Sequence, residues 1–116
     1  MIKGLSISVE QNAEKRILRL SGSIDAQTQS SLKQEIDSLF EKMHLYLLFD
    51  FTRVNSATEE ALHFLLAETE KFKKASGRLG VYGISDSVMQ IIKNADLERH
   101  LCIYRTEQEA LELMGN

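Results

Sequence analysis

A continuous apolar segment from Leu45 to Phe51 (LYLLFDF) restricts the fold of this chain more than any other feature. Strands of parallel sheets are covered on both faces and have such unbroken apolar runs, whereas half-exposed strands alternate apolar and polar residues. Parallel neighbours must be joined by crossover connections, which are usually helices. The segment therefore predicts the central strand of an α/β sheet.

Two segments that precede it alternate in the way expected of half-exposed strands. The first, LSISVE, has apolar side chains at Leu5, Ile7 and Val9, and the second is RILRLSG. The polar stretch from Gln11 to Lys15 lies between them and resembles a hairpin turn. We expect two short strands joined by this turn.

About four segments have the periodicity of amphipathic helices. The first follows Asp25, a suitable N-cap residue, and the second runs from about Ser56 to about Ala75. The last begins at a Thr-x-x-Glu capping box from Thr106 to Glu109. The apolar positions of the first three helices are Leu32, Ile36, Leu39, Phe40 and Met43; Ala61, Leu62, Leu65, Leu66, Thr69 and Phe72; and Val88, Ile91, Ile92 and Ala95.

Short strands are also expected after Gly77, in GRLGVYG, and in the segment LCIY. The resulting order is β-β-α-β-α-β-α-β-α. This order predicts an α/β fold with a mixed, mostly parallel sheet of about five strands and about four helices. We expect residues 1–116 to form a single domain, since a chain of this length buries one core.

Composition excludes several classes of function. The net charge of −3 gives no general affinity for nucleic acid or anionic lipid, and no stretch approaches the ~18 apolar residues of a membrane span. Cys102 is the only cysteine and has apolar neighbours, so we expect a buried thiol and no internal disulfide. We expect a cytoplasmic protein that neither binds nucleic acid nor inserts into a membrane.

The motifs of catalysis and cofactor binding are not found in the sequence. Neither G-x-G-x-x-G nor G-x-x-x-x-G-K-[ST] occurs, and the Glu60-x-x-His63 pair has no second copy of the kind that di-iron sites need. Asp25, Asp50 and the two glutamates 59 and 60 could instead meet at strand ends and bind Mg²⁺, but no substrate pocket or basic partner accompanies them. We expect no metal, no cofactor and no enzymatic activity.

The segment that joins the apolar strand to the second helix has two interpretations. In the structural one, Ser56 and Glu59 form a capping box, and Glu59 and Glu60 in the first turn interact favourably with the helix dipole. The acids then serve only the start of the helix.

In the functional interpretation, the same segment presents a binding surface. Phe64 projects away from the apolar arc of the helix, and Ala57 and Glu60 precede it by seven and four residues. The three would form a stripe with an aromatic centre and an acidic rim, which suits a partner protein. The alternative is that neighbouring elements cover Phe64.

Several segments resemble the STAS domain, the family of bacterial anti-sigma factor antagonists and of the cytosolic domains of sulfate transporters. They are LSGSIDAQTQSSLKQEI, LLFDFTRVNSATEEALHFLL, GRLGVYGIS and DLERHLCIYRTEQEAL, which together span nearly the whole chain. The family pattern in the second of these contains Asp-Ser-Ser-Gly, and there this chain differs.

In that pattern Asp50 matches an aspartate at the end of a strand, Thr58 replaces a second aspartate, Glu59 the phosphorylated serine, Glu60 the next serine and Ala61 the glycine. The resemblance implies a partner kinase, itself an anti-sigma factor, that phosphorylates the serine and thereby breaks the complex. Glu59 has no hydroxyl and cannot be switched in this way. It could imitate the phosphorylated state in part, or the control could have moved to Thr58 or Ser56.

The resemblance thus implies a non-enzymatic, bacterial regulator of transcription that works by partner switching with an anti-sigma-factor-like serine kinase. A homodimer is a further option. Thr58 and Ser56 are candidate phosphorylation sites. The expected partner-binding residues are Asp25, Ala57, Thr58, Glu59, Glu60, Phe64, Gly83 and Ser85.

Two other functions stay open at this stage. A STAS-like subunit could be held permanently in a transporter or a sensory complex, without a phosphorylation cycle. A sensor or enzyme for a small ligand is the third option.

Overall fold

A computed structural model of the chain describes residues 4–115 and has the element order that the sequence predicts. Its five strands form one sheet in the order β1-β2-β3-β4-β5, in which β1 is antiparallel to β2 and all other neighbours are parallel. The elements are β1 (Leu5–Asn12), β2 (Lys15–Ile24), α1 (Gln29–Glu41), β3 (Tyr46–Ala57), α2 (Glu59–Lys74), β4 (Arg78–Tyr82), α3 (Asp86–Asn94), β5 (Cys102–Tyr104) and α4 (Glu107–Leu113).

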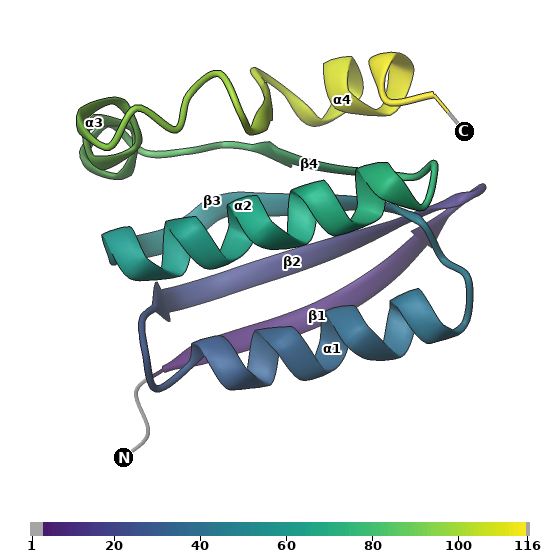
Figure 1. Ribbon diagram of the computed structural model, residues 1–116, viewed down its shortest axis with the longest axis horizontal. Helices are drawn as coiled ribbons and strands as arrows, with labels where there is room; N and C mark the ends of the chain where they lie inside the picture. The colour runs from purple at the N-terminus through teal and green to yellow at the C-terminus, as the bar shows by residue number, and fades with distance from the viewer. Residues whose placement is uncertain (1–3, 116) are drawn as a thin grey trace.

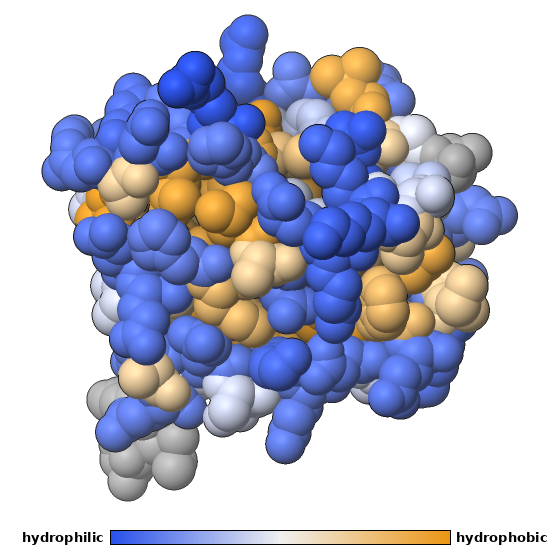
Figure 2. Space-filling view, in the orientation of Figure 1, coloured by the Kyte–Doolittle hydropathy of each residue, from blue (hydrophilic) through white to orange (hydrophobic). Residues whose placement is uncertain are grey.

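Helices cover the two faces of the sheet unequally (Figure 1). The larger core contains buried side chains of α1, α2 and α3, whereas α4 supplies Ala110 to a smaller core that also contains Ile17, Leu48 and Tyr82. Figure 2 shows hydrophilic side chains over most of the face that carries α1 and α2, with hydrophobic ones visible between them. The apolar periodicities of the sequence thus define the buried faces, but the prediction for Met43 is wrong, because Met43 follows the end of α1 and is 72% exposed.

Strand β3 is central, as the apolar segment predicts. Leu47, Leu48 and Phe49 have no exposed surface. Leu47, Phe49 and Phe51 belong to the larger core and Leu48 to the smaller one, so both faces of the strand are covered.

Strand β3 also extends well beyond the predicted segment, and it contains two irregularities in its pairing with β2. Arg19 pairs with Asp50 but Ser21 with Arg53, and Gly22 pairs with Val54 but Ser23 with Ser56. At each step β3 has one residue more than β2, which is the definition of a β-bulge. Bulges bend and twist a strand, and these two lie just before the segment of functional interest.

Two details concern the second half of the chain. Thr106 is the N-cap of α4 and accepts a hydrogen bond from the Glu109 N–H (3.0 Å), as predicted, while the Glu109 carboxylate accepts from the Arg105 N–H (2.6 Å). Cys102 lies on the edge strand β5 and is half-buried, so the prediction of a fully buried thiol is wrong. Among residues 4–115 no helix has the length and apolar character to cross a membrane.

Candidate functional site

Three connections that contain predicted site residues lie at the same end of the sheet, where the parallel strands end. They follow β2 (Asp25), β3 (the hinge, Ser56 to Glu60) and β4 (the loop Gly83 to Ser85). Since β2, β3 and β4 are parallel, their carboxyl ends lie side by side at this end of the sheet, where ligands of open α/β sheets usually bind. Figure 1 shows the end of β2, the start of α2 and α3 on the same side of the molecule.

The hinge is fixed to the end of β2 by its backbone and by one side chain. The Thr58 N–H donates to the Ile24 carbonyl (3.0 Å), and the Ser56 hydroxyl donates to the Ser23 hydroxyl (3.0 Å). These bonds set where α2 begins. The hinge therefore has a defined conformation although all its side chains except that of Ala57 are exposed.

The predicted capping box of Ser56 and Glu59 is wrong. Strand β3 continues through Ala57, so Ser56 has extended backbone, and Thr58 is the N-cap of α2. Its hydroxyl accepts a hydrogen bond from the Ala61 N–H (3.1 Å). The Glu59 carboxylate lies 3.5 Å from Nε2 of His63 instead.

The side chains of Thr58, Glu59 and Glu60 are all exposed, and that of Glu59 keeps 62% of its surface accessible. The predicted stripe does not form, however. Ala57 is 2% exposed and belongs to the larger core, because it points inward at the end of β3. Phe64 is half-buried against the same core, so neighbouring elements cover part of its ring.

Asp25 does not cap α1 as predicted, because the helix begins four residues later, at Gln29, after Thr28. Its carboxylate accepts from the N–H groups of Gln27 (2.9 Å) and Thr28 (3.0 Å). Asp25 thus stabilises the turn that leads into the helix. Asp25 is half-buried. It lies beside the hinge because the carbonyl of the preceding residue, Ile24, accepts a hydrogen bond from the Thr58 N–H.

The loop after β4 packs closely on β3. Gly83 has φ of +77°, and a Cβ at this position would lie 2.5 Å from Cγ2 of Thr52. Only glycine combines this backbone conformation with the required space. Ser85 is the N-cap of α3 and accepts from the Val88 N–H (3.3 Å). Both residues are half-buried, so part of each remains accessible.

A polar network lies on the face of the sheet that α4 covers, and the sequence patterns did not predict it. The Arg19 guanidinium donates hydrogen bonds to Asp50 (2.9 Å), Glu107 (2.6 Å), Tyr82 (3.0 Å) and Glu10 (3.0 Å). The Tyr82 hydroxyl donates to the same Glu107 carboxylate (2.8 Å). The signal for it was a single charge inside each of the apolar segments ILRL and LLFDF, since buried charges need partners.

The charge state of this network is fixed by its contacts. Burial by itself would raise the pKa of the Asp50 carboxyl, but hydrogen bonds from Thr52 and Arg19 outweigh it and lower this pKa. The hydrogen bond from Arg19 is the main cause of the lowered pKa of Glu107. Burial and then the hydrogen bond to Glu107 raise the pKa of Tyr82. At neutral pH, the Arg19 cation thus faces the carboxylates of Asp50 and Glu107, besides that of Glu10, and the neutral phenol of Tyr82.

Asp50 therefore has a different position from the one expected of a strand-end aspartate. It lies within β3, which continues to Ala57, and its carboxylate is bonded to Arg19 and to Thr52. In the described range 4–115, no three side chains of His, Cys, Asp or Glu are placed to hold a metal ion. Asp50 belongs to the network and not to the hinge.

Comparison with known proteins agrees with this geometry. The STAS domain model matches residues 6–110. An anti-sigma factor antagonist from Mycobacterium paratuberculosis has 25% identity and a TM-score of 0.84, with 95% of this chain and 93% of that chain covered. Unphosphorylated SpoIIAA, another anti-sigma factor antagonist, has 17% identity and a TM-score of 0.76, with coverage of 92% and 94%.

A third similar structure is a serine-to-glutamate variant of RsbS from Moorella thermoacetica, with 13% identity, a TM-score of 0.73 and 93% coverage of both chains. The two structures below 25% identity support the fold, and the family model covers most of the sequence. This chain belongs to the STAS domain family and resembles its anti-sigma factor antagonists, which makes it a regulatory module.

Proposed function

We propose that this chain is a non-enzymatic interaction module that binds an anti-sigma-factor-like serine kinase in partner switching. The observation that carries the proposal is the exposed segment Thr58 to Glu60 at the start of α2, beside the loops of Asp25 and of Gly83 to Ser85. These residues, with the exposed part of Phe64, form the contact surface. Ala57 is excluded from it because it is buried.

Glu59 and Glu60 give this surface a fixed negative charge. Neither carboxylate has a cation within 4.0 Å among residues 4–115 except His63, which is charged only when protonated. Exposed carboxylates favour a basic partner surface and repel an acidic one. The partner should therefore present Lys or Arg side chains opposite the hinge.

Glu59 also restricts how the interaction is controlled. A carboxylate has one charge and two acceptor oxygens, against about −1.5 to −2 and three for a phosphate group. Glu59 thus resembles a phosphorylated serine only partly, and permanently. The RsbS variant with glutamate in place of a serine supports the view that this fold tolerates such an exchange.

Thr58 and Ser56 are the hydroxyls available for phosphorylation near Glu59. Thr58 is the better placed, because it is exposed at the N-terminus of α2, where the helix dipole favours an added dianion. Ser56 is exposed as well, but its hydroxyl donates its proton to Ser23, whereas the Thr58 hydroxyl accepts from the Ala61 N–H. Phosphorylation of Thr58 would add charge to that of Glu59 and Glu60 and would change the affinity for the partner.

The test is the affinity for a purified kinase of the anti-sigma-factor class, measured by calorimetry with wild type and with Glu59→Lys,Glu60→Lys. We expect at least a tenfold loss, since two charges at the contact reverse sign. Glu14→Lys,Glu41→Lys is the matched control, because both acids are exposed and lie at the opposite ends of the strands, Glu14 just before β2 and Glu41 at the end of α1. Equal affinities of the two double variants would exclude the hinge from the interface.

The missing hydroxyl at Glu59 favours one second function, a subunit held permanently in a transporter or sensory complex. Such a subunit would form a stable complex that ATP does not dissolve. Incubation of the purified complex with ATP, followed by size-exclusion chromatography and mass spectrometry, separates the two. Dissociation with phosphate on Thr58 or Ser56 would exclude the permanent complex.

A further inference from the structure

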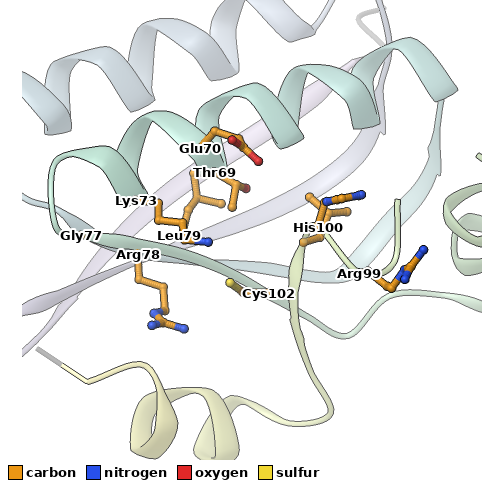
Figure 3. Close-up of a pocket in the computed structure, with 10 residues that line it drawn as sticks. Thr69, Glu70, Lys73, Gly77, Arg78, Leu79, Arg99, His100 and Cys102 are labelled. Atoms are coloured by element: carbon orange, nitrogen blue, oxygen red, sulfur yellow. The ribbon is translucent and has the colours of Figure 1, made fainter. Parts of the chain in front are cut away.

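The two edges of the sheet differ in how well their backbone groups are protected. Edge strands expose unpaired N–H and C=O groups, and proteins usually protect them with short strands, charged side chains, prolines or bulges. Strand β5 has only three residues. In Figure 3, which shows a cavity of about 220 Å³ beside this edge, the charged side chains of Arg78 and Arg99 lie on either side of Cys102, where β5 begins. The β5 edge is therefore short and charged.

Strand β1, at the other edge, lacks these protections. It has eight residues and pairs with β2 in one unbroken register from Leu5 to Asn12, without a bulge. These eight residues include no proline, lysine or arginine. The one charged side chain, that of Glu10, is bonded to Arg19 of the same chain (3.0 Å). A long, flat edge of this kind is a template for another strand.

The hairpin turn shows which backbone groups of β1 are free. Asn12 pairs with Lys15 across a two-residue turn, so these two residues exchange both of their backbone hydrogen bonds. At the other end of the strand the Ser23 N–H donates to the Gly4 carbonyl (3.1 Å), which fits the same alternation. Every second residue of β1 thus bonds to β2, and the N–H and C=O groups of the others point away from the sheet. These other residues are Leu5, Ile7, Val9 and Gln11.

The same strand is open to solvent along its length. Ser6 and residues 8–12 are exposed, and Leu5 and Ile7 are half-buried against the larger core. Val9 lies on the same face as Ile7 and keeps 38% of its surface, which makes it one of three exposed large apolar side chains among the described residues. The accessible surface of β1 therefore combines free backbone groups with an apolar strip.

From these observations we propose that β1 pairs antiparallel with β1 of a second copy of this chain, about a two-fold axis, so that the two sheets become continuous. A surface that meets its own copy across a two-fold axis must be complementary to itself. With Ser8 opposite the partner's Ser8, Ile7 lies opposite the partner's Val9, and Leu5 lies opposite the partner's Gln11. All four residues with free backbone groups then exchange hydrogen bonds, and the apolar strip is covered.

Charge and ladder length select this register. Glu10 lies opposite the partner's Ser6, whose hydroxyl can donate to the carboxylate. A register with Glu10 on the axis would set two like charges opposite each other, which is unfavourable. Registers with Ile7 or Val9 on the axis would leave one of the four free residues without a partner in β1. The complementarity lies within one strand, so the occupant is a second copy.

Sedimentation equilibrium of the full chain tests for the dimer. A ladder of about seven residues per strand gives a small interface and a weak dimer, so the concentrations extend to about 1 mM. We expect the mass to rise from 13.2 kDa toward twice that value. The mass of a single chain at every concentration would overturn the proposal. The proposed function would be unaffected, because the hinge is a separate surface.

Val9 supplies the matched variants. Val9→Pro removes an N–H that makes no bond to β2, so the chain keeps its own ladder while dimerisation should weaken at least about tenfold. Val9→Lys places a charge on the edge and should have a similar effect. Leu113→Lys is the control, since Leu113 is 63% exposed on α4, which packs on β3, β4 and β5, and should change dimerisation less than about twofold. Equal effects of the two lysine variants would mean unspecific association and would overturn the pairing.

Two serines test the register in a Cys102→Ala background, which removes the native thiol. Ser8→Cys places two thiols across the axis with Cα atoms about 4.5 Å apart, within the range of a disulfide. Ser6→Cys is the matched control, because Ser6 is equally exposed but its two copies would lie about 14 Å apart. We expect the disulfide-linked dimer to form at least about tenfold faster with Ser8→Cys. Equal rates would contradict the proposed dimer.

Discussion

The hinge and the network around Arg19 both contain acidic side chains, yet their surroundings differ in every respect. Asp50 and Glu107 share the Arg19 guanidinium, the Tyr82 hydroxyl donates to Glu107, and the side chains of the two acids are 11% and 33% exposed. Glu59 is 62% exposed, and its one near partner is a histidine 3.5 Å away. The contacts of Asp50 and Glu107 with Arg19 link β2, β3 and α4. The carboxylate of Glu59 contacts only a residue of its own helix, so it links no two elements.

This difference distinguishes structural acids from those available for binding. A carboxylate whose pKa is lowered by native contacts stabilises the fold, and its removal should reduce stability. A carboxylate without such contacts can be exchanged at small cost. Acids of the second kind, placed next to each other where strands end, are the ones that a partner can use.

The largest expected effect belongs to Arg19. In Arg19→Met, the carboxylates of Asp50 and Glu107 lose their cation while they remain partly buried, and we expect a loss of about 2 kcal/mol in the free energy of unfolding. Urea denaturation measures it. Arg53→Met is the control, because Arg53 is exposed and has no ion pair among the described residues, and should change stability by less than about 0.5 kcal/mol.

Acid should weaken the network next. The pKa values of Asp50 and Glu107 are lowered by folding, so their stabilisation is complete above the ordinary values of 3.8 and 4.5 and is lost as the pH falls through the lower folded values. Between about pH 6 and about pH 3 we expect a loss of roughly 1 kcal/mol that Arg19→Met lacks. Asp37, whose pKa is lowered mainly by Lys71 and Lys33 against the effect of burial, contributes equally in both proteins. Parallel pH profiles would contradict this assignment.

At the hinge, the N-cap should matter more than the acids. Thr58→Ala removes the hydroxyl that accepts from the Ala61 N–H and should cost about 1 kcal/mol, whereas Thr58→Ser should be nearly neutral. Ser56→Ala should cost less, about 0.5 kcal/mol, because it removes only an exposed hydroxyl pair. The reverse order in thermal denaturation would restore Ser56 as the N-cap.

An effect as small as that of Ser56→Ala is expected from Glu59→Gln,Glu60→Gln. Loss of two charges from the first turn of α2 weakens the interaction with the helix dipole. We expect the free energy of unfolding to fall by about 0.5 kcal/mol in total. A loss above about 2 kcal/mol would mean that these acids are structural. The distinction between the hinge and the network would then disappear.

Much of the fold was predictable because its signals are local. The unbroken run at Leu45 to Phe51 marks a strand covered on both faces, and the spacing of Leu32, Ile36 and Leu39 marks a helix with one buried face. The start of α2 was not predictable in this way. Ser56 and Glu59 match a capping box in sequence, but pairing between β2 and β3 keeps Ser56 extended, and pairing depends on a distant strand.

The site could be predicted only in part for a similar reason. The exposure of Glu59 and Glu60 follows from the amphipathic pattern of one helix. The burial of Ala57 depends on bulges that no local pattern reveals, and the partial burial of Phe64 depends on its neighbours. The Arg19 network joins residues 31 and 88 positions apart, so it required the register of the sheet.

The two extra residues of β3 also determine which changes of chain length the protein can accept. Each shifts the inward–outward alternation by one, and together they restore it, so Leu47, Phe49, Phe51 and Ala57 all face the larger core. Deletion of one of these two residues would remove a bulge but leave Ile24 paired with Ala57, so Ala57 would stay in the larger core and the start of α2 would keep its place. A change of one residue in this stretch is therefore absorbed by the pairing with β2, which keeps the acidic surface aimed in one direction.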